Sequence, residues 1–335
     1  MTFKKVSIIA AAGAVLLAGA IGIAISLTSP NAMEIDVVET PTEQQETETD
    51  GIKTLENMEH MPLYFDDTEK LLLPLRNVME GLGGSVQWDA EHHSTVVTYR
   101  GRKLELKAGE AEALLNGYAV TLPDAARMIN GCLYADAAVI SAYYTDKVEF
   151  DRETLQVTLQ TKDSTVPVVA VHREKAEQKD GSYTVDVPVI VGLNDGNFEK
   201  SLNSRLAEKM KTELQLFLTS EKEGDGILRL ELQQGLCTKE FLSLSWTGTE
   251  DGTERMLTEN IDLLGQKSVT LADLLEADSL AQLQETMGEN WTADGFFLTA
   301  EGMLILTDGK TAHAEPVPTD GLVWKGAYQG LFSGK

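Results

Sequence analysis

LLPLRNVMEGLGGSVQWD, residues 72–89, is the stretch that sets the fold of the first half of the chain. Its apolar side chains recur with the spacing of one helix face, at Leu75, Val78, Met79 and Leu82. Pro74 suits the first turn of a helix, and the pair Gly83-Gly84 predicts its end. The residues that follow have the composition of a short strand ending at Asp89. The stretch therefore predicts a helix and then a β-strand.

An antiparallel sheet is predicted to continue from this strand. Residues 94–99 have the composition of its hairpin partner, and residues 102–107 alternate apolar with charged side chains. Residues 112–122 form two short apolar runs around the pair Asn116-Gly117, a strong signal for a two-residue hairpin turn.

The helix-and-hairpin unit then occurs a second time. Residues 136–144 predict another helix, and VEFD at residues 148–151 repeats VQWD at residues 86–89, at an offset of 62 residues. Residues 155–160 repeat the outgoing strand. Two copies indicate an internal duplication, because a solenoid needs three or more units.

The residues of this region resemble a known family. The pattern LPLRxVxExLGGxVxWD at residues 73–89, with LNG at 115–117 and VEFD at 148–151, resembles the copper amine oxidase N-terminal-like stalk domain over about residues 61–161. The second copy departs from the pattern, with Asp-Ala-Ala at 136–138 in place of Pro-Leu-Arg. The resemblance implies an extracellular α+β module that is not the copper site of the oxidase. The chain has five histidines and no His-x-His pair.

The second half predicts a further α+β domain over residues 165–335. Residues 183–191 predict a strand, which Pro188 places near a sheet edge. An amphipathic helix is predicted from Asn197, with an apolar residue at every fourth position, at Phe198, Leu202, Leu206, Met210, Leu214 and Leu218. The stripe could bind a partner, but packing on a sheet of its own domain is favoured. Strands and a hairpin follow, at 227–233, 241–247, 260–268 and 296–306.

This order resembles a C-terminal domain of unknown function shared by lysozyme-sensing anti-sigma factors and certain peptidoglycan deacetylases. The matching residues are 187–193 with Leu202-Asn203, the block 260–275, and 297–305. Residues 307–318 depart from the aromatic strand usual in that family. The resemblance implies an extracytoplasmic sensing or wall-associated module without an active site. It also implies, as partner, a wall glycan such as peptidoglycan or a basic protein such as lysozyme.

The N-terminus predicts a membrane anchor. Residues 6–27 carry no charge over 22 positions and follow Lys4 and Lys5. As a helix they would extend about 33 Å, enough to cross a hydrocarbon core of about 30 Å. Residues 1–5 would then be cytoplasmic and the rest of the chain extracytoplasmic, as in a single-pass surface protein of a Gram-positive-type cell. A cleaved signal, followed by secretion, is the alternative, although the run exceeds the usual apolar core of about 7–15 residues.

Residues 28–60 are predicted to be a disordered acidic linker. Residues 34–59 hold nine Asp or Glu and a single Lys, without apolar periodicity. Such a segment buries too little apolar surface to offset its chain entropy. The five residues before the anchor are also too few to form an interface of about 800 Å², so we do not expect this chain to hold a sigma factor in the cytoplasm.

The formal net charge of −25 argues against nucleic acid as a partner, since a phosphate backbone attracts clustered Lys and Arg. It is compatible with a cationic partner or metal cations. Cys132 and Cys237 are too few for a disulfide scaffold, and we interpret both as buried apolar residues, with a bridge between them as the alternative.

No catalytic or metal signature is found in the sequence. His92-His93 lies between two strands and predicts a polar turn, because neighbouring strand residues point to opposite faces. Ser243 lacks the Gly-x-Ser-x-Gly elbow of a serine hydrolase, and there is no His-Glu-x-x-His or Cys-x-x-Cys motif. Asp195-Gly196 and residues 223–226 are interpreted as turns rather than calcium loops.

Four tryptophans are candidates for ligand contact. Trp88 and Trp246 lie in predicted strands and are assigned to the core, whereas Trp291 and Trp324 flank polar or Gly-rich stretches and are the surface candidates for ligand binding. The fold class is therefore two small α+β domains, with antiparallel sheets and short helices, after a transmembrane helix and a linker. The expected function is non-enzymatic binding at the cell surface, without a cofactor. A wall hydrolase or deacetylase accessory and a structural spacer are the alternatives.

Overall fold

The computed structural model describes residues 6–7, 23–29, 32–37, 51–178, 181–220, 226–287, 295–307 and 316–331. The chain divides into two compact units, Met1–Thr49 and Asp50–Lys335.

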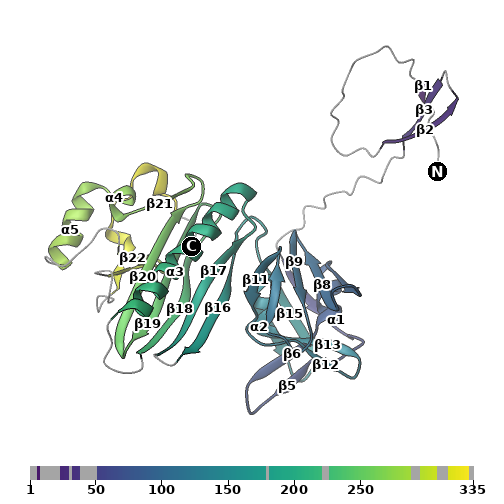
Figure 1. Cartoon of the computed structure of the whole chain (residues 1–335), viewed down its shortest axis with the longest axis horizontal. Coiled ribbons are helices and arrows are strands. Elements are labelled where there is room, and N and C mark those ends of the chain that lie inside the picture. Colours follow the sequence, from purple (N-terminus) through teal and green to yellow (C-terminus); the bar gives the residue numbers. More distant parts are fainter. Residues whose placement is uncertain are drawn as a thin grey trace. The chain divides into compact units, whose positions relative to one another are not determined.

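The first unit contains three short strands (Figure 1). They are β1 (Val6–Ser7), β2 (Ile23–Ser29) and β3 (Ala32–Val37), hydrogen-bonded in the order β1-β3-β2. Residues 8–22, the middle of the predicted anchor, lie outside the described residues. Among the residues that are described, no helix has both the length and the apolar character needed to cross a membrane. The anchor therefore stays a prediction.

The second unit begins with the duplicated region, and its antiparallel five-stranded sheet follows the sequence pattern closely. The sheet has the order β11-β10-β9-β8-β7. Its strands are β7 (Ser85–Asp89), β8 (Ser94–Tyr99), β9 (Arg102–Leu106), β10 (Glu112–Leu115) and β11 (Tyr118–Thr121). Helix α1 (Leu75–Leu82) precedes them, and Pro74 is its N-cap and the last residue of β6 (Lys70–Pro74) rather than part of its first turn.

In the structure, the second helix and hairpin follow the same order as the first. Helix α2 (Ala137–Tyr143) is followed by β14 (Thr145–Asp151) and β15 (Gln156–Thr161), as α1 is followed by β7 and β8. Both hairpins turn in the same way. The Asp89 carboxylate accepts the backbone N–H groups of Glu91 and His92, and that of Asp151 accepts those of Glu153 and Thr154.

The predicted linker is too long at its C-terminal end. Strand β4 (Ile52–Leu55) pairs with β15 in the sheet β14-β15-β4, and the N–H of Gly51 donates to Thr161 Oγ1 at 3.1 Å. The folded region therefore begins at residue 51 rather than 61. The sequence hides this strand because most of its side chains are exposed, so it lacks the apolar pattern of a buried element. A further sheet has the order β12-β13-β6-β5, with β5 (Leu63–Phe65), β12 (Arg127–Ile129) and β13 (Cys132–Asp136).

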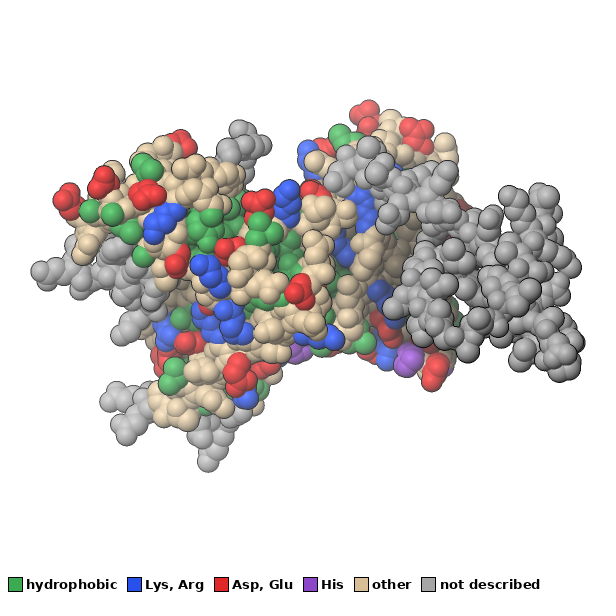
Figure 2. Space-filling view, turned by 90° about the horizontal axis from the view of Figure 1, so that it is seen from above, with side chains coloured by type: hydrophobic (Ala, Val, Ile, Leu, Met, Phe, Trp, Pro, Cys, Tyr) green, Lys and Arg blue, Asp and Glu red, His purple; other side chains and the backbone are tan. Residues whose placement is uncertain are grey.

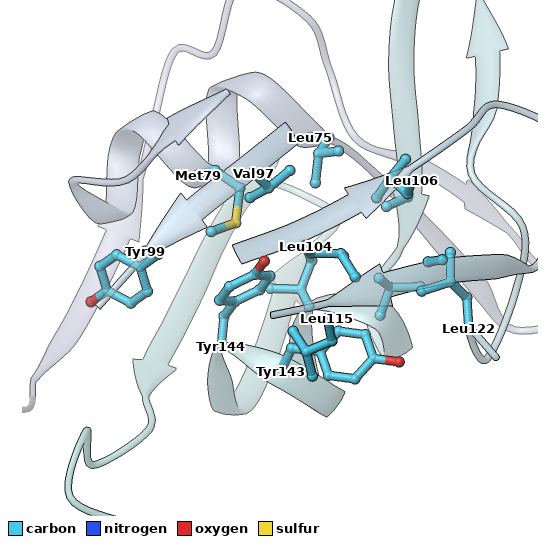
Figure 3. Close-up of a cluster of buried hydrophobic side chains, with 14 of the residues drawn as sticks. Leu75, Met79, Val97, Tyr99, Leu104, Leu106, Leu115, Leu122, Tyr143 and Tyr144 are labelled. Atoms are coloured by element: carbon cyan, nitrogen blue, oxygen red, sulfur yellow. The ribbon is translucent and has the colours of Figure 1, made fainter. Parts of the chain in front are cut away.

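One apolar core joins these sheets to both short helices (Figure 3). It includes Leu104, Leu115 and Tyr143, and it also takes in Val168 and Val189, which the sequence analysis assigned to the second domain. Arg102, only 3% exposed, donates to the carbonyl oxygens of Tyr143, Asp163 and Val166. Core and guanidinium together fix the segment that connects the two halves of this unit.

The second half contains a six-stranded sheet with the order β16-β17-β18-β19-β20-β21. Its strands are β16 (Val168–Gln178), β17 (Gly181–Val191), β18 (Gly226–Cys237), β19 (Phe241–Glu250), β20 (Thr253–Asp262) and β21 (Lys267–Ser268). All neighbours are antiparallel except β17 and β18, which are parallel and are joined through helix α3 (Gly196–Thr219). Figure 1 shows α3 lying across this sheet. The apolar stripe of α3, apart from the exposed Leu218, packs into the core with Trp246, which confirms the favoured interpretation of the stripe.

Strand β17 is interior to the sheet, yet Pro188 lies where one edge of the strand is unpaired. The pairing of β17 with β18 ends at Val185, and side chains supply the hydrogen bonds along the rest of that edge. Asn203 Oδ1 accepts the N–H of Ile190 and its Nδ2 donates to the Ile190 carbonyl, while Trp246 Nε1 donates to the carbonyl of Asp186. Alternate residues present backbone groups to the same edge, so Pro188 leaves no unsatisfied N–H between those two contacts.

The C-terminal residues pack against the end of this sheet. They form α4 (Leu271–Leu274), α5 (Ala277–Met287), β22 (Phe296–Leu298), β23 (Met303–Leu306), β24 (Val317–Pro318) and two short 3₁₀ turns, η2 (Thr319–Gly321) and η3 (Gly326–Tyr328). The predicted hairpin at 296–306 is confirmed by the pairing of β22 with β23. Antiparallel sheets with few helices thus bear out the α+β class.

Glu259 makes the fold sensitive to acid. Burial alone would raise the pKa of this carboxyl, but Lys209 Nζ at 2.6 Å, with Ser268 and Arg205, holds it below its ordinary value. A pKa lowered by folding gives stability that is present above the unfolded-state pKa and lost as the pH falls through the folded-state pKa. Glu259→Gln should lower the free energy of unfolding by about 1–2 kcal/mol at pH 7. The difference from wild type should then shrink between about pH 5 and pH 3. Urea unfolding across this range measures it. Glu254→Gln, an exposed change on the same strand, is the control and should leave the wild-type pH profile in place.

Candidate functional site

The surroundings of the tryptophans in the structure differ in part from those predicted from the sequence. Trp246 is fully buried, as predicted. Trp324 is only 8% exposed and belongs to the C-terminal apolar cluster, so its assignment to the surface is wrong. The core covers it because its backbone bridges Leu275. Trp291 lies outside the described residues. Trp88, assigned to the core from its strand, is 59% exposed, because it lies near the end of the edge strand β7.

Trp88 lines a pocket of about 230 Å³ that we call the β7 groove. Strand β7 supplies Trp88, helix α1 supplies Arg76, and the β12–β13 hairpin supplies Met128. Met128 is 56% exposed, an unusual position for a large apolar side chain. Glu59 and His60, just before β5, complete the polar part of the lining. The groove thus combines two exposed apolar side chains with one cation and one anion.

The second copy of the repeat shows what covers the equivalent aromatic ring. Phe150 occupies the position of Trp88, and its ring stacks on Tyr64 with centroids 6.4 Å apart. Arg152 also lies over the Tyr64 ring, with its guanidinium carbon 3.8 Å from the ring centroid. Trp88 has as aromatic neighbour only the exposed turn residue His93, at 6.4 Å and tilted, among the described residues. One copy of the duplicated strand therefore packs its half-buried aromatic ring against Tyr64, and the other leaves its ring open.

The groove also runs along an unpaired strand edge. Strand β7 is the last strand of its sheet, bonded only to β8 among the described strands. Every second residue of such a strand presents its N–H and C=O groups outward, where an extended chain can pair with them. Val86 and Gln87 of this strand both line the groove. The arrangement suits an extended polypeptide with an apolar side chain directed at Trp88.

The groove does not have the chemistry of a thiol enzyme, although Cys132 and His60 both line it. Burial, followed by the nearby Glu59, raises the pKa of the Cys132 thiol, and Arg76 opposes this only in part. A nucleophilic cysteine requires the opposite shift, because the thiolate is the reactive form. Cys237 is likewise protonated, since burial raises its pKa to about 12. Both thiols are free, so the bridge is not formed.

One group of metal-ligating side chains escaped the sequence analysis. Asp89, His92 and Glu105 place their ligand atoms within 4.8 Å of one another. The sequence shows Asp89 and His92 as neighbours in a turn, but Glu105 arrives only through the pairing of β8 with β9. The prediction that His92 and His93 do not share an ion is unaffected, because His93 turns toward Trp88.

Parts of this chain are similar to known proteins. A relative named "Protease inhibitor" from Brevibacillus choshinensis is 23% identical over 233 residues, covering 61% of this chain and 68% of that protein. Among solved structures, a DUF3298 family member from Bacteroides fragilis is 13% identical with a TM-score of 0.32, covering 57% of this chain and 99% of that chain. A DUF3298 family protein from Pseudomonas aeruginosa is 15% identical with a TM-score of 0.28, covering 47% and 92%.

Residues 50–191 match the family described as the copper amine oxidase N-terminal domain. This confirms the resemblance that the repeated motif indicated. The match begins just before β4 and extends through β17. It therefore includes β4, β16 and β17, which the predicted limits of 61–161 left out.

Proposed function

We propose that this protein is a non-enzymatic binding protein of the cell exterior, whose β7 groove holds an extended segment of a protein partner. Trp88 is the observation that carries the proposal. Its ring is open beside an unpaired strand edge, whereas the equivalent ring of Phe150 is covered by Tyr64. Exposed tryptophans in grooves are the side chains that most often dominate binding energy at protein interfaces.

The class of partner that we propose is a secreted protease. The relative from Brevibacillus choshinensis carries the name "Protease inhibitor", and a strand edge recognises polypeptide rather than sugar because its exposed groups are backbone N–H and C=O. The net charge of −25 would favour a basic partner. On the face shown in Figure 2, acidic and basic side chains are interspersed. Charge would therefore assist approach, and the groove would decide specificity.

The location outside the membrane is part of the same proposal. It rests on the uncharged run at residues 6–27 and the two lysines before it. An external protease added to intact cells should cleave within residues 38–50, while a cytoplasmic control protein stays whole. Protection of this segment in intact cells, with cleavage after lysis, would refute the location.

Trp88→Ala should weaken binding of the protein partner by about 30-fold, equivalent to about 2 kcal/mol. The purified chain would be immobilised and exposed to a panel of secreted serine, cysteine and metalloproteases, each inactivated at its active site or intact. Dissociation constants from biolayer interferometry give the effect. The thermal unfolding temperature of the variant should stay near that of wild type, because the side chain is 59% exposed.

Phe65→Ala is the matched control, since it removes another exposed aromatic side chain, 41% exposed, that does not line the groove. It should bind as the wild type does. Peptidoglycan fragments and lysozyme complete the panel, at low and moderate salt. Binding of glycan fragments that Trp88→Ala abolishes would replace the protein partner with a wall component. Equal affinity of Trp88→Ala and wild type for every bound protein would remove the groove from the function.

A further inference from the structure

Three potential metal ligands meet at the tip of the β7–β8 hairpin, on the opposite face of β7 from Trp88. Asp89 ends β7, His92 lies in the turn, and Glu105 comes from the middle of β9. His92 Nδ1 is 2.9 Å from Asp89 Oδ2, and all three ligand atoms lie within 4.8 Å of one another. One imidazole and two carboxylates are a ligand set used by divalent metals.

The sheet register brings these side chains together. Asp89 pairs with Ser94, and Glu105 pairs with Val96, two residues further along β8. Side chains two residues apart lie on the same face of a strand, so both carboxylates project from one face. The buried Ser94 hydroxyl donates to Glu105 Oε1 at 3.0 Å and fixes this carboxylate. Orientation of a ligand by a second side chain is the usual arrangement around protein-bound metals.

The second copy of the repeat is a built-in comparison for this hairpin. Asp151 accepts the same two turn N–H groups as Asp89 does, with Thr154 at the position of His92. In the second copy the strand beside β15 is β4, and Thr54 pairs with Thr158 as Glu105 pairs with Val96. Glu56, just after β4, accepts Gln156 Nε2 at 2.9 Å, so this copy also brings a carboxylate to the hairpin. The second hairpin therefore makes the same turn without a histidine, and the turn does not account for the presence of His92.

We propose that Asp89, His92 and Glu105 form a binding site for a divalent cation of the zinc class. Ligand atoms about 2.0–2.2 Å from a tetrahedral ion are about 3.3–3.5 Å apart. His92 Nδ1 and Asp89 Oδ2, 2.9 Å apart, would separate slightly around the ion, and the Glu105 oxygen, within 4.8 Å of the other ligand atoms, would move closer. The exposed His92 side chain allows this adjustment. The ion would replace the hydrogen bond between His92 and Asp89. Three protein ligands leave a fourth position for water, and an exposed site of this kind should bind in the micromolar range.

Isothermal titration of the full chain with zinc chloride tests the site, with any polyhistidine tag removed and at pH 7.5. We expect one site per chain. His92→Ala and Glu105→Gln should each weaken it by more than about tenfold, since loss of an outer-shell group alone typically costs 10–100-fold. Substitution with Co²⁺ gives a second readout, because visible absorption bands report the ligands directly.

His93→Ala is the matched control, because it removes the neighbouring exposed histidine of the same turn, and it should leave zinc affinity unchanged. Absence of any one-to-one zinc binding, or equal affinity in His92→Ala and wild type, would overturn the proposal. So would an equal loss in His93→Ala and His92→Ala.

Discussion

Ser243→Ala should destabilise the protein by about 2–4 kcal/mol, whereas Ser245→Ala, two residues along the same strand, should change stability little or raise it. Both serines are fully buried in β19. Ser243 Oγ donates to Asn260 Oδ1 at 2.7 Å and accepts the N–H of Leu298 at 2.9 Å. Asn260 Nδ2 in turn donates to the Phe296 carbonyl. Within the described part of the chain, the Ser245 hydroxyl has no hydrogen-bond partner.

The difference follows from what each substitution leaves behind. Removal of the Ser243 hydroxyl leaves the Leu298 N–H and one Asn260 lone pair without partners in a dry interior, and each such group costs about 1–3 kcal/mol. Removal of the Ser245 hydroxyl takes away a buried polar atom that gains nothing in the fold. Urea unfolding of both variants measures the two free energies. Equal losses would show that packing at β19, rather than the Ser243 network that binds β22 to the sheet, sets the cost.

Arg173→Met should cost about 3 kcal/mol at neutral pH, close to the lower end of the range for breaking a buried ion pair. The Asp186 carboxylate is 2% exposed and accepts Arg173 Nε at 2.7 Å, Arg173 Nη2 at 3.1 Å and the N–H of Leu232 at 3.1 Å. The hydrogen bond to Asp186 also raises the pKa of Arg173. Without Arg173, an ionised carboxylate stays buried with one backbone donor. Arg173 itself reaches solvent, which keeps the cost below the upper limit for such pairs.

The double variant Arg173→Met with Asp186→Asn should recover at least half of this loss, because a neutral amide is far easier to bury than an unpaired charge. Lys211→Met is the control. Its pairing with Glu208 is exposed on both sides, and such pairs contribute about 0–1 kcal/mol. A double variant as unstable as Arg173→Met alone would locate the effect in the lost arginine contacts instead of the buried charge. Chemical denaturation of wild type, Arg173→Met, the double variant and Lys211→Met measures the four free energies of unfolding.

The sequence does not predict the hydrogen-bond network of Ser243 or the ion pair of Asp186, although it predicts the strands that carry these residues. Ser243 and Asn260 lie in segments whose strand character is evident from local composition. Their contact depends on the register of β19 against β20, and Leu298 arrives from a hairpin 55 residues away. Asp186 looks like an ordinary polar residue in a strand until the parallel pairing of β17 with β18 brings Leu232 to it.

For the candidate site, too, the sequence predicted some features and only the structure decided the others. The repeat placed Trp88 and Phe150 in equivalent positions, which made their different surroundings meaningful. Their exposure, however, was decided by Tyr64, which covers one ring, and by the position of β7 at a sheet edge. The pair Asp89 and His92 is visible in the sequence, whereas Glu105 joins it across two strands. The burial of Trp324 depends on its bridge to Leu275, 49 residues earlier.

By itself, the sequence determined many of the helices and strands, the repeat of the helix-and-hairpin unit within residues 72–160 and the inward stripe of α3. These properties follow from the spacing of apolar and polar side chains along the chain, because helices and strands each require a characteristic spacing. Tertiary structure alone decided that Ile52–Leu55 joins the fold, that Trp88 is open and Trp324 closed, and which carboxylate meets His92. Exposure and convergence depend on what packs against a residue from elsewhere in the chain, and register, not composition, selects that neighbour.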